Sequence, residues 1–391
     1  MTLFCIVLFW VAATGLTYVL LGYPLISLFA SGLVQHKRFP PCEPTVSLII
    51  PAHNEQLVVE AKIENSLRLD YPREKLDIVV ASDGSEDDTE AIARSYEDRG
   101  VTLLAFSPRR GKASVLTDAA IHVTSEVLCF CDANVMFDPS ALRTLTGRLG
   151  DESVGAVSGD VQIASHESDF GHGEQLYYRL ERSLQLAESL IGSLIGVDGG
   201  MYLVRSELFQ PLPPDTILDD FVTSMRVVRQ GYRVVYEPDA VARENGTPTA
   251  AQEWRRRVRV AAGTVQSVMR GEWPPLNRPV ELWQYVSHKA LRWMTPLFMI
   301  VLLWTSVVLA SSSVLYLIAL VSQLLGYFVA CLGWIFLRFR RTRFGGVPFY
   351  FVMSNIAMAV GLVKGLFRMQ PVMWPHADRS LAGQAVEQKS S

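Results

Sequence analysis

Four short apolar runs alternate with polar segments in the first third of the chain, and this alternation constrains the fold more than any other feature. The runs are residues 47–50 (SLII), 77–82 (DIVVAS), 101–106 (VTLLAF) and 127–131 (VLCFC). The polar segments between them have the composition of surface helices, at residues 55–69, 87–99 and 112–124. Apolar strands alternating with helices predict a parallel sheet covered on both faces. We therefore expect an α/β fold with a mostly parallel, Rossmann-like sheet, extended by strands at residues 154–163 and 232–238.

Three stretches outside this region carry almost no charge. Residues 3–34 have no charged side chain, and residues 295–310 and 314–339 are nearly uncharged. A transmembrane helix needs about 20 apolar residues, so these stretches are candidate spans. The mean hydropathy of +0.21 is high for a soluble protein and low for a polytopic transporter. We therefore expect a soluble domain with flanking transmembrane helices, one within residues 1–34 and the others within residues 292–368.

Two basic clusters predict the orientation in the membrane. QHKR at residues 35–38 and RFRRTR at residues 338–343 follow apolar stretches, and basic residues stay on the cytoplasmic side. This places the amino terminus outside and a domain of residues 45–250 in the cytoplasm, in a multi-pass protein of the cell membrane, either inner or plasma membrane. A cleaved signal peptide is the alternative for the first segment, but it lacks a preceding basic region and a small-x-small cleavage site.

Two further segments are expected at the membrane surface. Residues 251–291 mix Arg, Trp and apolar residues at helical spacing, which predicts interfacial amphipathic helices. Residues 347–366 are apolar but end near Lys364 and Arg368, so this segment either spans the membrane or lies in its interface. Residues 369–391 form a tail.

Several classes of protein fit the sequence poorly. The net charge of −3 gives no overall attraction for nucleic acid, so no nucleic-acid partner is expected. The five cysteines contain no C-x-x-C pair, which argues against a zinc site and for reduced cysteines. The first strand is not followed by G-x-G-x-x-G, so a dinucleotide-binding dehydrogenase is a poor match.

Acidic and polar clusters follow the first, second and fourth predicted strands. They are PAHNE (51–55), SDGSEDDT (82–89) and DAN (132–134). Ligands bind beyond the carboxyl ends of strands in an open parallel sheet, so the clusters should face one crevice. There Asp132 could hold a hard divalent cation, Asp83 could accept hydrogen bonds from a base or ribose, and Lys112 could meet a diphosphate. The alternative is that these side chains only cap helices and form turns.

Together these motifs resemble a known family. PAHNE, SDGSEDDT, GKASVLTDA and CDAN occur in the order and spacing of the donor half of a family 2 glycosyltransferase of fold type A. GVDGGMYLVRSEL (196–208), ILDDF (217–221) and QEWRRRVR (252–259) are similar to its acceptor loop, its T-E-D motif and its Q-x-x-R-W motif. The resemblance covers about residues 45–263. With the flanking spans, the chain looks like the membrane-bound cellulose, hyaluronan and poly-N-acetylglucosamine synthases.

The resemblance implies a role for each matching residue. The expected activity is inverting transfer from a UDP-hexose or UDP-N-acetylhexosamine to a polysaccharide or lipid-linked acceptor, with Mg²⁺ or Mn²⁺ as cofactor. Asp220 would be the general base, supported by Asp219, and the loop of Gly199 and Gly200 would face the acceptor. The other roles are the uracil pocket (Pro51, Ala52, Glu55, Asp83), the metal site (Asp132, Asn134) and the diphosphate site (Lys112, Gln252, Arg255, Arg256). His53 is expected only as a wall of the nucleotide pocket.

The sequence also departs from the family pattern. The metal motif is usually D-x-D, and here Asn134 replaces the second acid, which should weaken metal binding. T-E-D is L-D-D, and Arg256 stands where the family has the Trp that stacks on the acceptor, which puts processivity in doubt. A non-processive transferase for a lipid or short acceptor therefore remains an alternative, as does an inactive, transferase-like transport or binding module. With about four spans, secretion of a product would need a homo-oligomer or an export partner.

Overall fold

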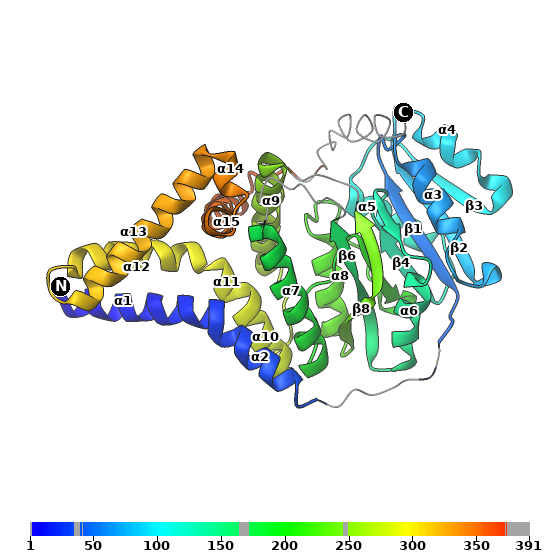
Figure 1. The fold of residues 1–391 in the computed structure, drawn as a ribbon. Helices are drawn as coiled ribbons and strands as arrows, with labels where there is room; N and C mark the ends of the chain where they lie inside the picture. Colours follow the sequence, from blue (N-terminus) through cyan, green and yellow to red (C-terminus); the bar gives the residue numbers. More distant parts are fainter. Residues whose placement is uncertain are drawn as a thin grey trace.

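The computed structural model describes residues 2–34, 40, 42–163, 172–244, 249–371 and 373. An α/β domain occupies one end of the molecule, and a group of long apolar helices extends from the other (Figure 1). The QHKR cluster and nearly all of the predicted tail lie outside the described residues. The structure therefore does not test the predictions that concern them.

The α/β domain is built on one eight-stranded sheet. Its strands are β1 (Val46–Ala52), β2 (Leu76–Asp83), β3 (Val101–Phe106), β4 (Val127–Cys131), β5 (Val135–Phe137), β6 (Val154–Ile163), β7 (Met201–Arg205) and β8 (Arg233–Glu244). The spatial order is β3-β2-β1-β4-β7-β6-β8-β5. Pairings β1–β2, β1–β4, β2–β3 and β6–β8 are parallel, whereas β4–β7, β6–β7 and β5–β8 are antiparallel. The predicted parallel sheet is thus confirmed for the first half, and the second half is mixed.

Both faces of the sheet are covered by helices, which explains the uninterrupted apolar strands. Alternate residues of a strand point to opposite faces. Accordingly, Leu48 and Ile50 belong to the core under α3, α4 and α6, whereas Ile49 belongs to the core under α5 and α8. The domain helices are α3 (Val59–Leu67), α4 (Thr89–Arg94), α5 (Lys112–Ile121), α6 (Ala141–Gly147), α7 (His172–Ile191) and α8 (Asp219–Arg229). This two-sided core holds the carboxyl ends of β1, β2 and β4 at one edge.

The remaining helices, most of them apolar, lie on the far side of α7. They are α1 (Thr2–Thr17), α2 (Tyr23–Ser31), α9 (Ala250–Met269), α10 (Pro279–Gln284), α11 (Leu291–Trp293), α12 (Thr295–Leu309), α13 (Val314–Ile335), α14 (Leu337–Arg340) and α15 (Arg343–Leu366). Turns of π-helix at residues 18–22 and 285–290 join α1 to α2 and α10 to α11. By length and composition, the described residues contain three helices able to cross a membrane, residues 2–31, 314–335 and 343–366.

A fourth span would need the bent pair formed by residues 279–293 and 295–309, which meet at 55°. Part of the segment predicted as interfacial therefore continues directly into the predicted first carboxyl-terminal span. Most apolar side chains of α13 are exposed, as expected for a helix surrounded by lipid.

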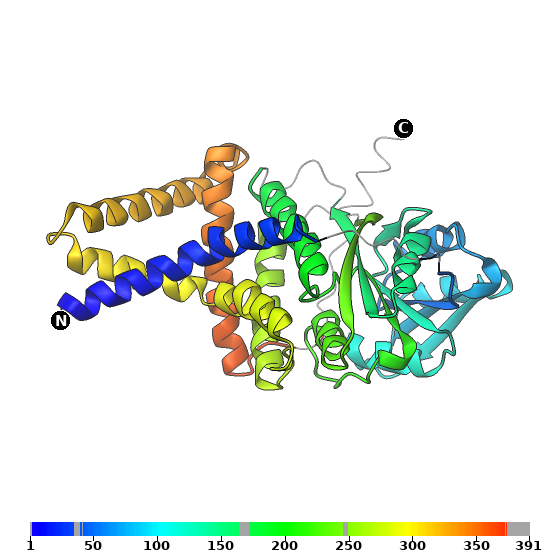
Figure 2. The same ribbon diagram turned by 90° about the horizontal axis from the view of Figure 1, so that it is seen from below.

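Helix α15 is arranged differently from the other apolar helices. It runs crosswise to α1 and α13 and lies alongside α9 (Figure 2). Glycines allow this close approach: a Cβ at Gly361 would come within 2.4 Å of the Val258 carbonyl oxygen, and one at Gly365 within 2.8 Å of that of Ala262. The crosswise arrangement is compatible with a helix in the membrane interface, and the same helix is long and apolar enough to span the membrane.

A buried polar contact joins the amino-terminal helix to the α/β domain. The Tyr23 hydroxyl of α2 donates to the carboxylate of Glu188 in α7, and the His288 ring lies 2.7 Å from the same oxygen. Glu188 is fully buried. Since a buried carboxylate is stable only with such partners, this contact fixes where α2 meets the α/β domain.

Candidate active site

The centre of the site is an ion-paired lysine that joins the two halves of the domain. Lys112 is the first residue of α5 and follows Gly111, whose φ of 91° lets the chain turn into the helix. Its Nζ lies 2.7 Å from Oδ1 of Asp132, at the end of β4, and 3.6 Å from Oδ2 of Asp219, at the start of α8. Burial alone would lower the pKa of Lys112, but these carboxylates raise it overall, so it stays a cation.

Asp219 and Asp220 are adjacent acids in the first turn of α8. The Oδ2 of Asp219 is buried and accepts no hydrogen bond from any described residue, although the Lys112 ammonium lies near it. Asp220 is half-buried, and burial together with the Asp219 charge raises its pKa to about 7. Such a pKa suits a carboxylate that must both hold and release a proton near neutral pH.

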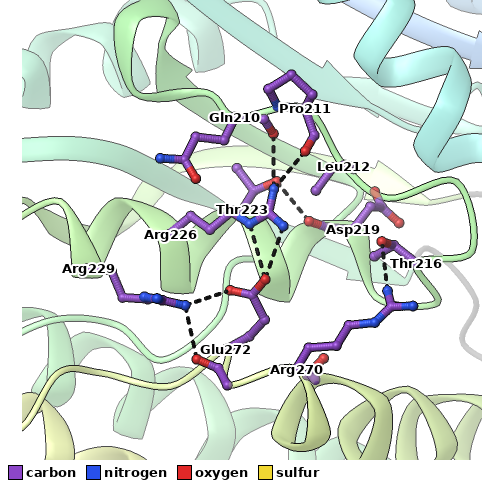
Figure 3. A network of polar contacts seen from close by, with 12 residues as sticks. Gln210, Pro211, Leu212, Thr216, Asp219, Thr223, Arg226, Arg229, Arg270 and Glu272 are labelled. Atoms are coloured by element: carbon purple, nitrogen blue, oxygen red, sulfur yellow. Dashed lines mark hydrogen bonds and ion pairs between the residues drawn. The ribbon is translucent and has the colours of Figure 1, made fainter.

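The opposite end of α8 is clamped by a second polar network (Figure 3). Arg226 donates to Glu272 and to the Pro211 carbonyl, and Arg229 lies 3.5 Å from Glu272 and bonds the Gly271 carbonyl. Glu272 is 5% exposed and sits in the turn after α9. The network ties α8 to that turn, so the position of Asp219 and Asp220 depends on contacts two to three helical turns away.

The glycine loop before β7 makes room for the second acid. A Cβ at Gly199 would lie 2.9 Å from Oδ2 of Asp220, closer than real Cβ contacts occur. The Gly200 N–H donates to Oδ1 of Asp198, which shapes the turn. The predicted acceptor loop therefore lies directly against the predicted base.

Asp83 is placed differently from the prediction. It is only 3% exposed, and its two oxygens accept the backbone N–H groups of Arg110 and Gly111 at 2.7 and 2.8 Å. Arg109 lies 3.9 Å from the same carboxylate. Asp83 thus holds the loop that leads into Lys112, which makes it a positioning residue more readily than a direct contact of the nucleobase.

A pocket of about 760 Å³ opens beside this loop. Its lining comes from the ends of β1, β2 and β3: His53, Asn54, Gly84, Ser85, Glu86, Glu90, Ala105, Phe106, Ser107, Pro108 and Arg109. His53 lines the pocket, as expected, and its Nδ1 lies 2.9 Å from the Asp83 carbonyl. Pro51 and Ala52 are buried in the strand instead, and the Glu55 N–H donates to Thr89. The pocket has room for a nucleoside. Its wall is formed by His53 and Asn54, which follow the predicted Pro51 and Ala52 in the sequence.

Three residues of α9 were predicted to hold the diphosphate, and the structure places them differently. The Gln252 side chain accepts the Thr249 N–H in a capping box at the start of α9, and exposed Arg255 bonds the Ala251 carbonyl. Arg256 bonds Glu253 and lies within electrostatic range of two acids, Asp198 and Glu244. Of these three residues, Arg256 is the one brought to the acidic site.

Two acids of this site were missed by sequence reasoning. Burial raises the pKa of Asp198, with Asp132 adding to the effect, and burial also raises the pKa of Glu244, again with Asp132 contributing. Both stand at an end of a strand, Asp198 just before β7 and Glu244 as the last residue of β8. An acid at the carboxyl end of a strand was the signal that identified Asp132, and the same signal would have found Glu244. Asp198 precedes its strand, and the antiparallel pairing of β7 with β4 brings it to the same edge.

The residues present fit a hard divalent cation. Asp132 already holds a cationic group, the Lys112 ammonium, and its carboxylate is partly exposed. Oxygen ligands of this kind suit Mg²⁺ or Mn²⁺, which take one or two carboxylates and complete their shell with phosphate oxygens. Within the described residues, no group of three or more His, Cys, Asp or Glu side chains is placed to hold a metal ion.

Comparison with known proteins places this geometry in a class. Residues 47–210 match the model of the family Glycosyl transferase family 2. The solved structure of the mannosyltransferase PcManGT from Pyrobaculum calidifontis, in complex with GDP-Man and Mn²⁺, has a TM-score of 0.69 at 24% identity and covers 93% of this chain and 100% of that one. The fold is thus that of the type A glycosyltransferases.

Curated relatives agree with this class. Probable glycosyltransferase YdaM of Bacillus subtilis (strain 168) is 25% identical over 240 residues, covering 58% of this chain and 57% of that protein. Poly-beta-1,6-N-acetyl-D-glucosamine synthase of Staphylococcus aureus (strain COL) is 26% identical over 231 residues, covering 58% and 56%. The chain thus spans little more than half of each relative.

Residues 47–210 of this protein match the glycosyl transferase family 2 domain, and the two relatives are a probable glycosyltransferase and a polysaccharide synthase. The matched residues include Asp83, Lys112 and Asp132 but end before Asp219 and Asp220. The roles of the second half therefore depend on the geometry described above.

Proposed function

We propose that the enzyme is an inverting transferase that moves a hexose or N-acetylhexosamine from a UDP-sugar to a growing polysaccharide or a lipid-linked acceptor at the membrane. The observation that carries the proposal is the convergence of Asp132 from the donor half and Asp219 from the second half on Lys112. Asp220, next to Asp219, then lies where a donor bound at Asp132 meets an acceptor at Gly199.

In the proposed reaction Asp220 accepts the proton of the acceptor hydroxyl while that oxygen attacks the anomeric carbon. The bond from this carbon to the diphosphate oxygen breaks, and its electron pair leaves with the nucleoside diphosphate. Attack from the face opposite the leaving group inverts the anomeric centre, so an α-linked donor gives a β-linked product. A positioned base of this kind accelerates attack by about 10²- to 10⁴-fold.

The leaving diphosphate needs positive charge. Lys112 pairs with Asp132, and Arg256 acts electrostatically on Glu244, so we assign both cations to the diphosphate together with Arg255 and Gln252. Mg²⁺ or Mn²⁺ held by Asp132 would neutralise further charge on the departing oxygens. The nucleobase would occupy the pocket beside His53, with Asp83 holding its loop in place.

We further propose that the catalytic domain faces the cytoplasm of a multi-pass membrane protein. The exposed apolar surface of α1 and α13 supports burial in lipid, and the basic α14 supports a cytoplasmic end for α13. Helices α9 and α15 lie between the α/β domain and the outer ends of α1 and α13 (Figure 2). They would then lie at the membrane surface.

The experiment that tests the function is a donor screen on the full chain, purified in detergent and reconstituted in lipid. Radiolabelled UDP-glucose, UDP-N-acetylglucosamine and GDP-mannose are each supplied with Mn²⁺, Mg²⁺ or EDTA, and GDP-mannose is included because PcManGT binds it. We expect transfer from a UDP-sugar that EDTA abolishes, and its loss in Asp220→Asn. Transfer that persists in Asp220→Asn, or no transfer from any donor, would contradict the proposal.

A second candidate, a non-processive transferase, is supported by Arg256. This residue replaces the acceptor-stacking Trp of the resembling synthases, and its guanidinium is bonded to Glu253 and to the Tyr178 hydroxyl. Product length separates the two candidates: a single added sugar supports this one, and a polymer supports the first.

A further inference from the structure

A hydrogen bond links the altered metal motif to an acid far away in the sequence. The Nδ2 of Asn134 donates to Oε1 of Glu244 at 3.0 Å. The antiparallel pairing of β5 with β8 places Val135 directly opposite Glu244, so the contact is fixed by the sheet. Asn134 stands at the position where the family that this chain resembles has a second Asp. Its amide therefore donates to a carboxylate instead of supplying one.

Glu244 also lies among the charges of the active site. The carboxylates of Asp132 and Asp198 and the guanidinium of Arg256 all act on it electrostatically. The last residue of β8 therefore adds its negative charge to the acidic group at the end of β4. An amide donor can hold a neighbouring carboxylate ionised, which a second Asp at position 134 could not do.

Another acid beside this strand pair faces elsewhere. Asp138 follows β5 and pairs with Arg243. Since successive strand residues point to opposite faces, Arg243 and Glu244 project from opposite sides of β8. The same two strands therefore direct Glu244 and Asp138 to different surroundings.

We propose that Glu244 supplies the second carboxylate of the divalent-cation site, replacing the acid absent at position 134, with Asp132 as the first. Asn134 then acts as a positioning residue that orients Glu244. The proposal rests on the proposed function in that a cation bound with the nucleotide diphosphate is assumed. Two carboxylates plus phosphate oxygens are the ligand set that Mg²⁺ and Mn²⁺ accept.

Metal binding to the purified full chain tests this without reference to activity. The electron paramagnetic resonance signal of free Mn²⁺ is titrated against protein, alone and with UDP or GDP. We expect Glu244→Gln to weaken Mn²⁺ binding about tenfold to a hundredfold. The matched control Asp138→Asn removes an acid from the same strand pair and should bind as wild type. Wild-type affinity in a folded Glu244→Gln would overturn the proposal.

A charge swap sharpens the test. In Asn134→Asp with Glu244→Gln, the hydrogen bond survives with its donor and acceptor exchanged, and the total charge is unchanged. We expect Mn²⁺ affinity to return to within about threefold of wild type, because one carboxylate again joins Asp132. If the folded swap variant binds Mn²⁺ as weakly as Glu244→Gln, the carboxylate of this pair is not a metal ligand, and the proposal is refuted.

A measurement on the unaltered chain covers the case in which Glu244→Gln fails to fold. Fe²⁺ bound in place of Mn²⁺, with ascorbate and hydrogen peroxide, cleaves the backbone next to its ligands. Cuts near both residue 132 and residue 244 support the proposal, and cuts near residue 132 alone overturn it. Either result is readable in a chain that transfers no sugar, so failure of this inference is distinct from failure of the proposed function.

Discussion

The raised pKa of Asp220 makes the pH dependence of transfer a direct test of its role as base. Burial first, and the Asp219 charge second, raise the pKa of Asp220 to about 7 from the ordinary value of about 3.9. A base must be ionised to accept a proton, so transfer should rise as pH increases through this pKa. The ionised fraction is about one tenth at pH 6, one half at pH 7 and nine tenths at pH 8.

Neighbouring charges should move this midpoint in a predictable direction. Asp219→Asn removes a negative charge that disfavours ionisation of Asp220, so its midpoint should fall below that of wild type. Exposed Asp77 in β2 is the control, and Asp77→Asn should leave the midpoint unchanged.

The assay is initial-rate transfer of radiolabelled sugar by reconstituted protein between pH 5.5 and 9 in one constant-ionic-strength buffer. The midpoint is taken from kcat/KM, which reports the free enzyme. At pH 8 and above, where Asp220 is mostly ionised, Asp220→Asn should lose about a hundredfold or more. A profile that is flat from pH 6 to 8, or an Asp219→Asn midpoint above wild type, would refute the reasoning.

Three further changes test how the site is built. Gly199→Ala should lower kcat at least about tenfold with unchanged thermal unfolding, because the new Cβ would lie 2.9 Å from the Asp220 carboxylate; wild-type kcat would contradict this. Glu272→Gln should lower the free energy of unfolding by about 2 kcal/mol in denaturant titrations, because it leaves Arg226 without its buried partner; an unchanged value would show that the clamp is dispensable. Gly361→Leu should separate α15 from α9 and expose new sites to limited proteolysis, whereas an unchanged digest would exclude the close packing.

Much of the donor half could be predicted from local pattern. The apolar runs at residues 101–106 and 127–131 coincide with β3 and β4, and the predicted helix start at Lys112 is that of α5. These features depend on residues close in sequence: buried parallel strands are apolar throughout, and Gly111 supplies the turn. Once the strands are predicted, their carboxyl ends are known as well. Asp132 was identified as a site residue because it directly follows such an end.

What the sequence by itself determined is therefore the strands of the first half, the apolar helices and the acids at the ends of β2 and β4, whereas β5, Asp198 and Glu244 were not predicted. What only the tertiary structure decided is which of these acids meet. Lys112 lies more than a hundred residues before Asp219, and Asn134 lies 110 residues before Glu244. No local pattern encodes such contacts, because they arise from the packing of α8 and from the pairing of β5 with β8. The same packing turned Asp83 inward, where its carboxylate holds two backbone N–H groups.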